Sequence, residues 1–245
     1  MILVRYALKL EYIGKNYCGS QKQPSGNSIQ DILELSLCTL IKKKIKTIFS
    51  GRTDKGVNSK GQIVSFDLDE PIVASRFINS INGILPSDIS VSEIVPVEDD
   101  FHAQRWAKKR YYRYVFVNRS QRSAFDGNLM LVRKPLNVER MKQALEYLKG
   151  EHDFTSFRGA QSDVPSSICF IYDVDCKKVD DKIIVDIVGN RFLYNMVRII
   201  IGTLLLIEKY NLEPSAMKDF IEMKDRTKAG KTVSPYGLTL MKVEY

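Results

Sequence analysis

The stretch IVSFDLDEPIVASRFINSINGILPSDISVSEIVPV, residues 63–97, contains the pattern that decides the fold. Apolar residues at every second position of 64–68 predict a strand with one buried face. A helix is expected over 76–85, because Pro86 follows it and proline disfavours helical geometry in the preceding residue. The residues ISVSEIVPV, 89–97, predict a second strand. This segment is therefore expected to fold as strand, helix and strand.

The residues before this stretch predict a further strand and helix. The chain opens on alternating apolar and polar residues, which are typical of a strand. Ser28 and Asp31 have the spacing of a capping box, and apolar residues at helical spacing continue to Ile41. A short strand is expected near 47–49. Residues 1–105 thus have the order strand, helix, strand, strand, helix, strand, which is the split βαβ order of ferredoxin-like domains.

The second half of the chain repeats this order loosely. RYYRYVFV, ICFIYDVDC and KIIVDIVG are expected to be strands, Asn137 is expected to cap a helix, and a long apolar helix is predicted over about 191–209. No linker rich in proline, glycine or serine separates the halves. We therefore predict an α+β fold of two ferredoxin- or RRM-like subdomains, 1–105 and 106–245, whose mainly antiparallel sheets join around a central basic cleft.

Positive charge indicates a polyanionic partner. The chain has a net charge of +8, and between His102 and Phe125 it has no acidic residue but seven arginines and lysines. Aromatic residues are interleaved with these cations, as expected where phosphates attract the cations and bases stack on the rings. The alternative is a solvated strand with one aromatic core face. We favour the nucleic-acid interpretation.

Metal and membrane classes of protein are not indicated. The cysteines have neither CxxC spacing nor histidines in zinc-finger register, so we expect reduced core residues and no metal. The opening residues alternate like a strand, unlike a signal peptide, and the longest apolar stretch, IIIGTLLLI, is too short to cross a bilayer. We therefore expect a cytoplasmic protein without a membrane segment. The cysteines are Cys18, Cys38, Cys169 and Cys176.

Residues 50–62, SGRTDKGVNSKGQ, place a carboxylate among positive charges. Asp54 follows Arg52 by two positions and directly precedes Lys55. The ordinary interpretation is a turn, in which Asp54 bonds its own backbone and Gly56 supplies a positive φ. Taken alone, this segment indicates nothing more than a turn.

The chain as a whole resembles the tRNA pseudouridine synthase A family. The segments that carry the resemblance follow the family's order and spacing: QKQPSGNSIQDILE, GRTDKGV, INGILPSDISV, FHA followed by RYYRY, HDFTSFR, NRFLYNMVRIIIG, DRTKAGKT and GLTLMKVEY. The resemblance implies the pseudouridine synthase fold, tRNA as substrate with the anticodon stem-loop as target, and a homodimer. Isomerisation of uridine needs no oxidant and no hydrolysis, so we expect no cofactor and no metal.

The resemblance also implies three catalytic residues. The aspartate of the family's GRTD motif is the nucleophile, which implies Asp54 here. Arg198 matches the arginine that pairs with this aspartate, and Tyr112 matches the tyrosine that stacks on the target base. A carboxylate can add to the uracil ring, add to the ribose or remove a ribose proton, and all three routes stay open. Without the resemblance, Arg198 would be an arginine snorkelling from an apolar helix and Tyr112 a core tyrosine.

Further residues are expected to line the path of the RNA. Most of them match family positions, whereas Arg105 is included mainly for its charge. They are Arg52, Phe101, His102, Arg105, Arg110, Arg158 and Gln161.

The chain departs from the family pattern beside several of these positions. Serine replaces a tryptophan, asparagine and a Tyr-Asn pair replace histidines, and serine and cysteine replace a proline and an arginine. The departures are Ser20, Asn58, Tyr194, Asn195, Ser167 and Cys169.

Two other functions are consistent with parts of this pattern. Two RRM-like domains can bind RNA without catalysis, although a pure binder has no need of a carboxylate facing a polyanion. A metal-dependent nuclease would need clustered carboxylates, and the segment around Asp54 offers one.

Overall fold

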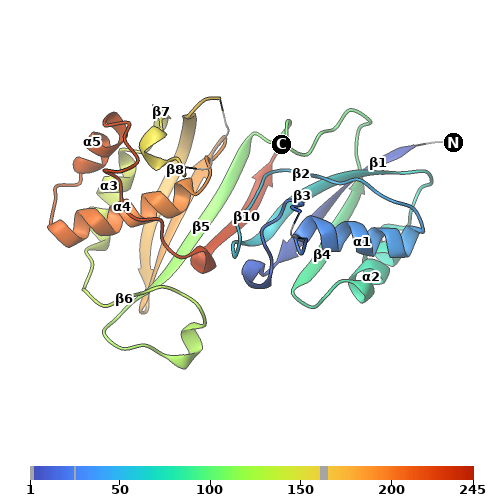
Figure 1. The fold of residues 1–245 in the computed structure, drawn as a ribbon, viewed down its shortest axis with the longest axis horizontal. Coiled ribbons are helices and arrows are strands. Elements are labelled where there is room, and N and C mark those ends of the chain that lie inside the picture. The colour runs from blue at the N-terminus through green and yellow to red at the C-terminus, as the bar shows by residue number, and fades with distance from the viewer. Residues whose placement is uncertain (1–2, 25, 161–164) are drawn as a thin grey trace. The chain divides into compact units, whose positions relative to one another are not determined.

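The computed structural model describes residues 3–24, 26–160 and 165–245, which form two compact units (Figure 1). The first unit comprises Met1–Lys108 and Leu240–Tyr245, and the second comprises Lys109–Thr239. The C-terminal residues therefore return to the first unit.

The first unit is built on an antiparallel sheet. Its elements are β1 (Val4–Tyr12), η1 (Gly14–Asn16), α1 (Ile29–Ile41), β2 (Ile48–Phe49), β3 (Asn58–Leu68), α2 (Ala74–Ile84), β4 (Ile89–Pro96) and the end of β10 (Leu238–Glu244). β1 lies between β3 and β4, so that Leu8 pairs with Val64 on one side and with Ile94 on the other. The short β2 pairs with β3, and β10 is the next strand beside β3.

Helices α1 and α2 cover one face of this sheet (Figure 1). Apolar side chains from helices and strands meet in the core between them, where Leu8, Leu10, Leu33, Leu37 and Ile81 are fully buried. Removing such side chains from water is the main favourable contribution to folding. The alternation at 64–68 and the helical spacing before Ile41 thus mark the core as predicted.

The predicted ends of these helices are confirmed. The hydroxyl of Ser28 accepts the backbone N–H of Asp31 at 3.1 Å, and the carboxylate of Asp31 accepts the N–H of Ser28 at 3.1 Å. This is the capping box expected from the sequence. α2 ends before Pro86, and the side-chain amide of Asn82 bonds both the N–H and the C=O of Val91 at 2.8 Å. These bonds attach α2 to β4.

The second unit has its own antiparallel sheet. Its elements are β5 (Lys109–Asn118), η2 (Ala124–Asp126), β6 (Leu131–Val132), α3 (Val138–Glu146), β7 (Gly150–Asp153), η3 (Thr155–Phe157), β8 (Ile168–Val179), β9 (Lys182–Gly189), α4 (Met196–Tyr210), α5 (Ala216–Glu222) and η4 (Pro235–Gly237). The strand order is β5-β9-β8-β7, and β6 pairs with β5 in parallel. Helices α3, α4 and α5 cover one face of it (Figure 1). Tyr112, Tyr114 and Phe116 are buried on one face of β5, in agreement with the alternative interpretation of one aromatic core face.

Helix α4 begins later than predicted. We expected it over about 191–209, and it spans Met196–Tyr210. Asn195 has a φ of 61°, in the left-handed region, and a right-handed helix cannot continue through such a residue. Further along the helix, a Cβ at Gly202 would lie 1.8 Å from the carbonyl oxygen of Lys231, so only glycine fits there.

These observations confirm an α+β fold with mainly antiparallel pairing. The short strands β6 and β7 were not predicted. Over the described ranges, no helix is both long enough and apolar enough to span a membrane.

Candidate active site

The segment that contains Asp54 is a tight turn between β2 and β3. The backbone N–H of Val57 donates to the carbonyl of Asp54 at 3.1 Å, and Gly56 has a φ of 83°. The turn expected at Asp-Lys-Gly is therefore present, with glycine at the position that requires a positive φ. Asp54 itself is half-buried.

Thr53, the residue before Asp54, forms hydrogen bonds through its N–H, its carbonyl and its hydroxyl. The N–H of Thr53 donates to the hydroxyl of Ser20 at 2.8 Å, and the carbonyl of Thr53 accepts the N–H of Ser20 at 3.0 Å. The hydroxyls of Thr53 and Tyr12 are 2.8 Å apart. All three side chains are buried, so water does not compete for these bonds.

A buried polar network extends these contacts into β3. The side-chain amide of Gln62 donates to the carbonyl of Gly51 at 2.9 Å and to the hydroxyl of Tyr12 at 3.4 Å. The hydroxyl of Ser50 donates to the side-chain oxygen of Gln62. Burial raises the pKa of Tyr12, while its hydrogen bonds to Thr53 and Gln62 act in the opposite direction. The phenol therefore stays protonated, and the loop is positioned by neutral groups.

The segment before α1 packs directly against this turn. A Cβ on Gly14 would lie 2.1 Å from the carbonyl oxygen of Val57, and one on Gly19 would lie 2.9 Å from that of Thr53. The N–H of Gly14 donates to the side-chain oxygen of Asn58 at 3.0 Å. Glycine at both positions permits a backbone-to-backbone approach that a larger residue would prevent.

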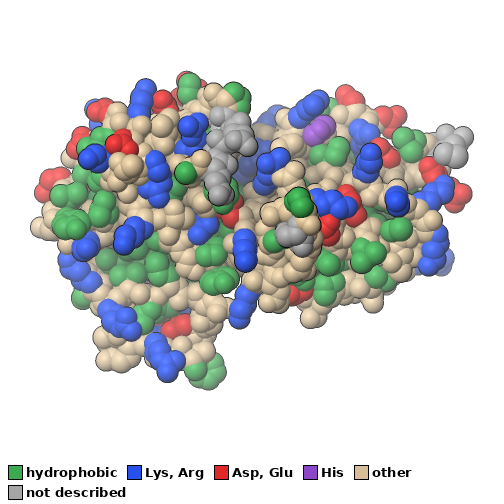
Figure 2. Space-filling model, viewed as in Figure 1, with side chains coloured by type: hydrophobic (Ala, Val, Ile, Leu, Met, Phe, Trp, Pro, Cys, Tyr) green, Lys and Arg blue, Asp and Glu red, His purple; other side chains and the backbone are tan. Residues whose placement is uncertain are grey.

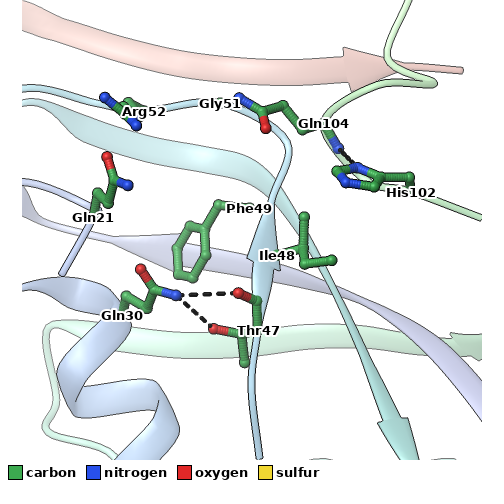
Figure 3. Close-up of a pocket in the computed structure, with 9 residues that line it drawn as sticks. All are labelled: Gln21, Gln30, Thr47, Ile48, Phe49, Gly51, Arg52, His102 and Gln104. Carbon is green, nitrogen blue, oxygen red and sulfur yellow. Dashed lines mark hydrogen bonds between the residues drawn. The ribbon is translucent and has the colours of Figure 1, made fainter.

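A polar pocket lies beside the same loop (Figure 3). It has a volume of about 280 Å³. The side-chain amide of Gln30 donates to the carbonyl of Thr47 at 3.1 Å, and the ring of Phe49 forms part of the wall. Amide groups and an aromatic ring are the groups that contact bases in single-stranded RNA. The lining residues are Gln21, Gln30, Thr47, Ile48, Phe49, Gly51, Arg52, His102 and Gln104.

The structure brings two predicted RNA-binding residues, Arg52 and His102, to this pocket. The Nδ1 atom of His102 accepts the backbone N–H groups of Gln104 at 3.2 Å and Arg105 at 3.3 Å. The ring is thereby oriented with Nδ1 as an acceptor. The side chain of Arg105 is exposed.

Phe101 has a different environment. It is buried, and its ring centre lies 5.5 Å from that of Trp106 and 5.0 Å from that of Tyr245. These contacts describe a packed core residue near the C-terminal strand. Its contact with RNA stays a prediction.

In the second unit, Tyr112 and Arg110 lie on β5. Tyr112 is buried, and its ring meets that of Phe192 edge-on at 5.1 Å between centres. The guanidinium of Arg110 donates to the carbonyl of Asn190. The packing of Tyr112 agrees with the core interpretation, and its stacking on a base stays a prediction.

Arg198 is oriented within the second unit by neutral acceptors. Its Nε donates to the carbonyl of Val233 at 2.8 Å, and an Nη donates to the side-chain oxygen of Asn195. Nearby, the hydroxyl of Tyr114 donates to the carbonyl of Ser234 at 2.8 Å. Burial raises the pKa of Tyr114, and the charge of Arg198 acts in the opposite direction. The guanidinium is thus fixed in a half-buried position, unlike a snorkelling arginine. Its pairing with Asp54 stays a prediction, because Asp54 belongs to the first unit.

Two further predicted RNA contacts belong to the segment after β7. Arg158 is half-buried at the end of η3, and the next residue, Gly159, donates its N–H to the carbonyl of Tyr194 at 2.9 Å. Gln161 lies outside the described residues.

In the described residues, the cysteines form no disulfide and the possible metal ligands form no cluster. In the parts of the chain that the structure describes, no group of three or more His, Cys, Asp or Glu side chains could hold a metal ion. All four cysteines are free, and two of them, Cys169 and Cys176, are buried. Burial raises the pKa of Cys169 to about 11 and that of Cys176 to about 12, so both are thiols at neutral pH.

Sequence reasoning missed the residues that hold the loop. Tyr12, Ser20 and Gln62 were not among the predicted site residues, except that Ser20 was noted as a departure from the family pattern. The one available signal was Gln62, a polar residue within an otherwise apolar strand pattern. Such a residue must find a partner when buried.

Known proteins match almost the whole chain in sequence. The family described as tRNA pseudouridine synthase matches residues 9–104 and 144–245. The tRNA pseudouridine synthase A of Ehrlichia canis (strain Jake) is 41% identical, covering 99% of this chain and 100% of that protein. The protein of the same name from Clostridium acetobutylicum is 40% identical, covering 97% of this chain and 98% of that one. That from Thermoanaerobacter sp. (strain X514) is 38% identical, covering 96% and 97%.

Solved structures are also similar, at lower sequence identity. In the crystal structure of a Cbf5-Nop10-Gar1 complex, a chain is 10% identical with a TM-score of 0.46, over 96% of this chain and 48% of that one.

The sequence matches define the class of protein as an isomerase that acts on uridine in RNA. The chain belongs to the tRNA pseudouridine synthase family, and the resemblance inferred from its motifs is confirmed.

Proposed function

We propose that this enzyme isomerises uridines in the anticodon stem-loop of tRNA, with Asp54 as the nucleophile. The observation that carries the proposal is the restrained backbone around Asp54: Thr53 is bonded at its three polar atoms, and the carbonyl of Asp54 closes the turn at Val57. A catalytic group must be held close to the productive geometry, because a misplacement of about 1 Å can cost on the order of 100-fold in rate.

The chemistry asks little of the protein beyond this placement. The N1–C1′ glycosidic bond breaks, the base rotates, and a C5–C1′ bond forms. The proton of C5 is lost and N1 gains one, so substrate and product are isomers. Asp54 acts at the uracil ring or at the ribose. Arg198 keeps the carboxylate negative, and Tyr112 stacks on the base and assists the removal of the C5 proton.

The RNA contacts form the second part of the proposal. A uridine within a stem must leave its stack, which costs a few kcal/mol. Cations and rings must offset this cost. Arg52 and His102 line the pocket beside the loop that contains Asp54, and they provide a cation and a ring. We assign Arg105, Arg110 and Arg158 to the phosphates, and we place the reaction in the cytoplasm.

The decisive test measures release of tritium. tRNA labelled with tritium at uracil C5 is incubated with the protein without added metal, and tritium in water is counted. The wild-type protein should release label, and Asp54→Ala should release none. Asp99→Ala, which removes an exposed carboxylate of the same unit, is the matched control and should behave as wild type. Binding of tRNA without release by the wild type would instead establish an RNA-binding protein without catalysis.

We also propose that the enzyme works as a homodimer. Ile168, Phe170 and Tyr172, the β8 patch, are exposed, whereas the alternating Cys169 and Ile171 are buried. The rings of Phe170 and Tyr172 have centres 4.9 Å apart. A cluster of exposed apolar side chains on a sheet is typical of a protein interface, and a second copy of this chain is the partner we assign to it.

The oligomeric state can be measured by sedimentation at micromolar concentration. The wild type should sediment as a dimer, and Phe170→Asp with Tyr172→Asp should give a monomer, because charge opposes burial of the patch. Phe125→Asp places one such charge at another exposed ring and should leave the dimer intact. A monomeric wild type would contradict this part of the proposal.

A further inference from the structure

The segment that precedes α1 holds the catalytic turn through a serine that the family pattern does not contain. We propose that Ser20 is a positioning residue for the Asp54 carboxylate, and that it acts through Thr53 together with Tyr12. The inference rests on the proposed role of Asp54. Ser20 replaces a tryptophan of the family pattern. We infer that this serine affects the reaction by positioning Asp54, and not only by changing a contact with RNA.

The geometry restrains the two peptide units that flank the α-carbon of Asp54. The peptide before it has its carbonyl on Thr53, and this oxygen accepts the N–H of Ser20 at 3.0 Å. The peptide after it has its carbonyl on Asp54, and this oxygen accepts the N–H of Val57 at 3.1 Å. With both peptides held, φ and ψ of Asp54 are restricted, and the carboxylate keeps only its side-chain rotations.

Ser20 is itself anchored to a rigid element. Its carbonyl accepts the N–H of Gln30 at 3.0 Å, in the first turn of α1, and the neighbouring carbonyl of Gly19 accepts the N–H of Ile29 at 3.1 Å. Ser20 therefore connects α1 to the loop that contains Asp54. Its hydroxyl accepts the N–H of Thr53 at 2.8 Å. Sites supported by helices and strands are held more tightly than sites on free loops.

Water cannot take over these contacts. Ser20 is 1% exposed and Thr53 is 6% exposed. Without the Ser20 hydroxyl, the N–H of Thr53 would be a buried donor without its partner, and the loop would relax to satisfy it. Asn58 contributes on the other side of the turn, where it accepts the N–H of Gly14 at 3.0 Å. Two departures from the family pattern therefore hold the ends of one loop.

The test separates turnover from binding. Ser20→Ala should lower kcat for tritium release by roughly 10- to 100-fold, the range expected for a misplaced catalytic group, and leave KM for tRNA within about 2-fold. The backbone amide of Thr53 should exchange with solvent faster than in the wild type, as followed by NMR. Ser36→Ala removes a buried hydroxyl from α1 in the same unit and should leave kcat and Thr53 exchange unchanged.

A second variant covers the case in which Ser20→Ala does not fold. Tyr12→Phe removes one bond to Thr53 and keeps the ring, and it should also lower kcat at constant KM. Where both variants fold, their effects on kcat should be less than additive, because they act on the same residue. Unchanged kcat in the folded variants, or a loss of tRNA affinity alone, would overturn the inference. An active Asp54→Ala variant would contradict the proposed function itself. An inactive Asp54→Ala variant together with fully active Ser20→Ala and Tyr12→Phe variants would contradict only the role of Ser20.

Discussion

At the level of single residues, the proposed catalytic side chains are oriented by neighbouring polar groups. Arg198 has its guanidinium placed by Asn195 and by the carbonyl of Val233, within its own unit. Asn195 has the left-handed conformation that asparagine and aspartate both tolerate. An aspartate can therefore replace Asn195 with little change of backbone or volume. The variant then differs from the wild type in charge alone.

We predict opposite effects of this charge on stability and on activity. Asn195→Asp puts a carboxylate against the Arg198 guanidinium, which then has less positive charge to offer Asp54, so tritium release should fall at least about tenfold. The same carboxylate lies at the N-terminus of α4, where the helix dipole favours it by about 0.3–1 kcal/mol. Thermal unfolding should therefore show no loss of stability.

The control for this prediction is at the other end of the same helix. Asn211 is also left-handed, with a φ of 51°, and caps the C-terminus of α4. Asn211→Asp should lower stability slightly, because the dipole disfavours a negative charge there. It should leave tritium release unchanged. Equal activity of the two variants would contradict the role of Arg198.

Tyr112 can be tested by removing its hydroxyl alone. Tyr112→Phe keeps the ring and should keep tRNA affinity, because stacking of a base on a ring contributes about 1–3 kcal/mol without the hydroxyl. It should slow release of the C5 proton, measured as tritium in single-turnover experiments. Tyr111→Phe, at the half-buried neighbouring position, is the control. Identical rates for the two variants would leave Tyr112 as a stacking ring only.

The buried thiols predict a loss of stability at high pH. Burial raises the pKa of Cys176 from 9.0 to about 12, so above pH 9 the unfolded chain loses a proton that the folded chain keeps. Stability should fall as pH rises beyond 9, by about 1.4 kcal/mol per pH unit. The difference in unfolding free energy between wild type and Cys176→Ala should shrink by about 1.4 kcal/mol between pH 8 and pH 10. A constant difference in urea titrations would show that the thiol titrates normally.

At the scale of helices and strands, the sequence predicted the elements with a clear period and missed the rest. The capping box of α1, the end of α2 before Pro86 and the strands β8 and β9 follow from local patterns. β6 has two residues and β7 has four, too few to display an alternation. The contact between Ser20 and Thr53 joins residues 33 apart in sequence, so no local pattern encodes it.

A pair of glycines gives a prediction at this scale. Gly202 in α4 lies against the carbonyl of Lys231, whereas a Cβ on Gly83 in α2 would meet nothing within 4 Å. Gly202→Ala should lower the free energy of unfolding by about 1–3 kcal/mol, as expected for overpacking. Gly83→Ala should raise it by up to about 1 kcal/mol, because alanine is the better helix former. Urea titrations of the two variants should therefore move in opposite directions.

At the scale of the whole molecule, the excess of positive charge is only partly available to RNA. Lys and Arg side chains are spread over the face shown in Figure 2. Within the basic segment, however, Arg113 forms an ion pair with Asp186 at 2.7 Å, and Arg119 bonds both Asp126 and Asp181. The sequence alone indicates that these arginines are available to RNA. The aspartates that pair with them lie elsewhere in the chain, so the segment itself does not reveal the pairing. Arg105 and Arg122 are exposed.

This difference predicts how tRNA binding depends on salt. Each phosphate contact contributes about 0.7–0.9 to the slope of log K against log salt concentration. Arg105→Ala and Arg122→Ala should each reduce the slope by about that amount, measured by filter binding between 50 and 200 mM salt, roughly the range over which such contacts weaken. Arg113→Ala should leave the slope unchanged and lower stability, because its charge is engaged with Asp186. A slope that falls equally for all three variants would mean that net charge, not the exposed position of particular arginines, governs the attraction to tRNA.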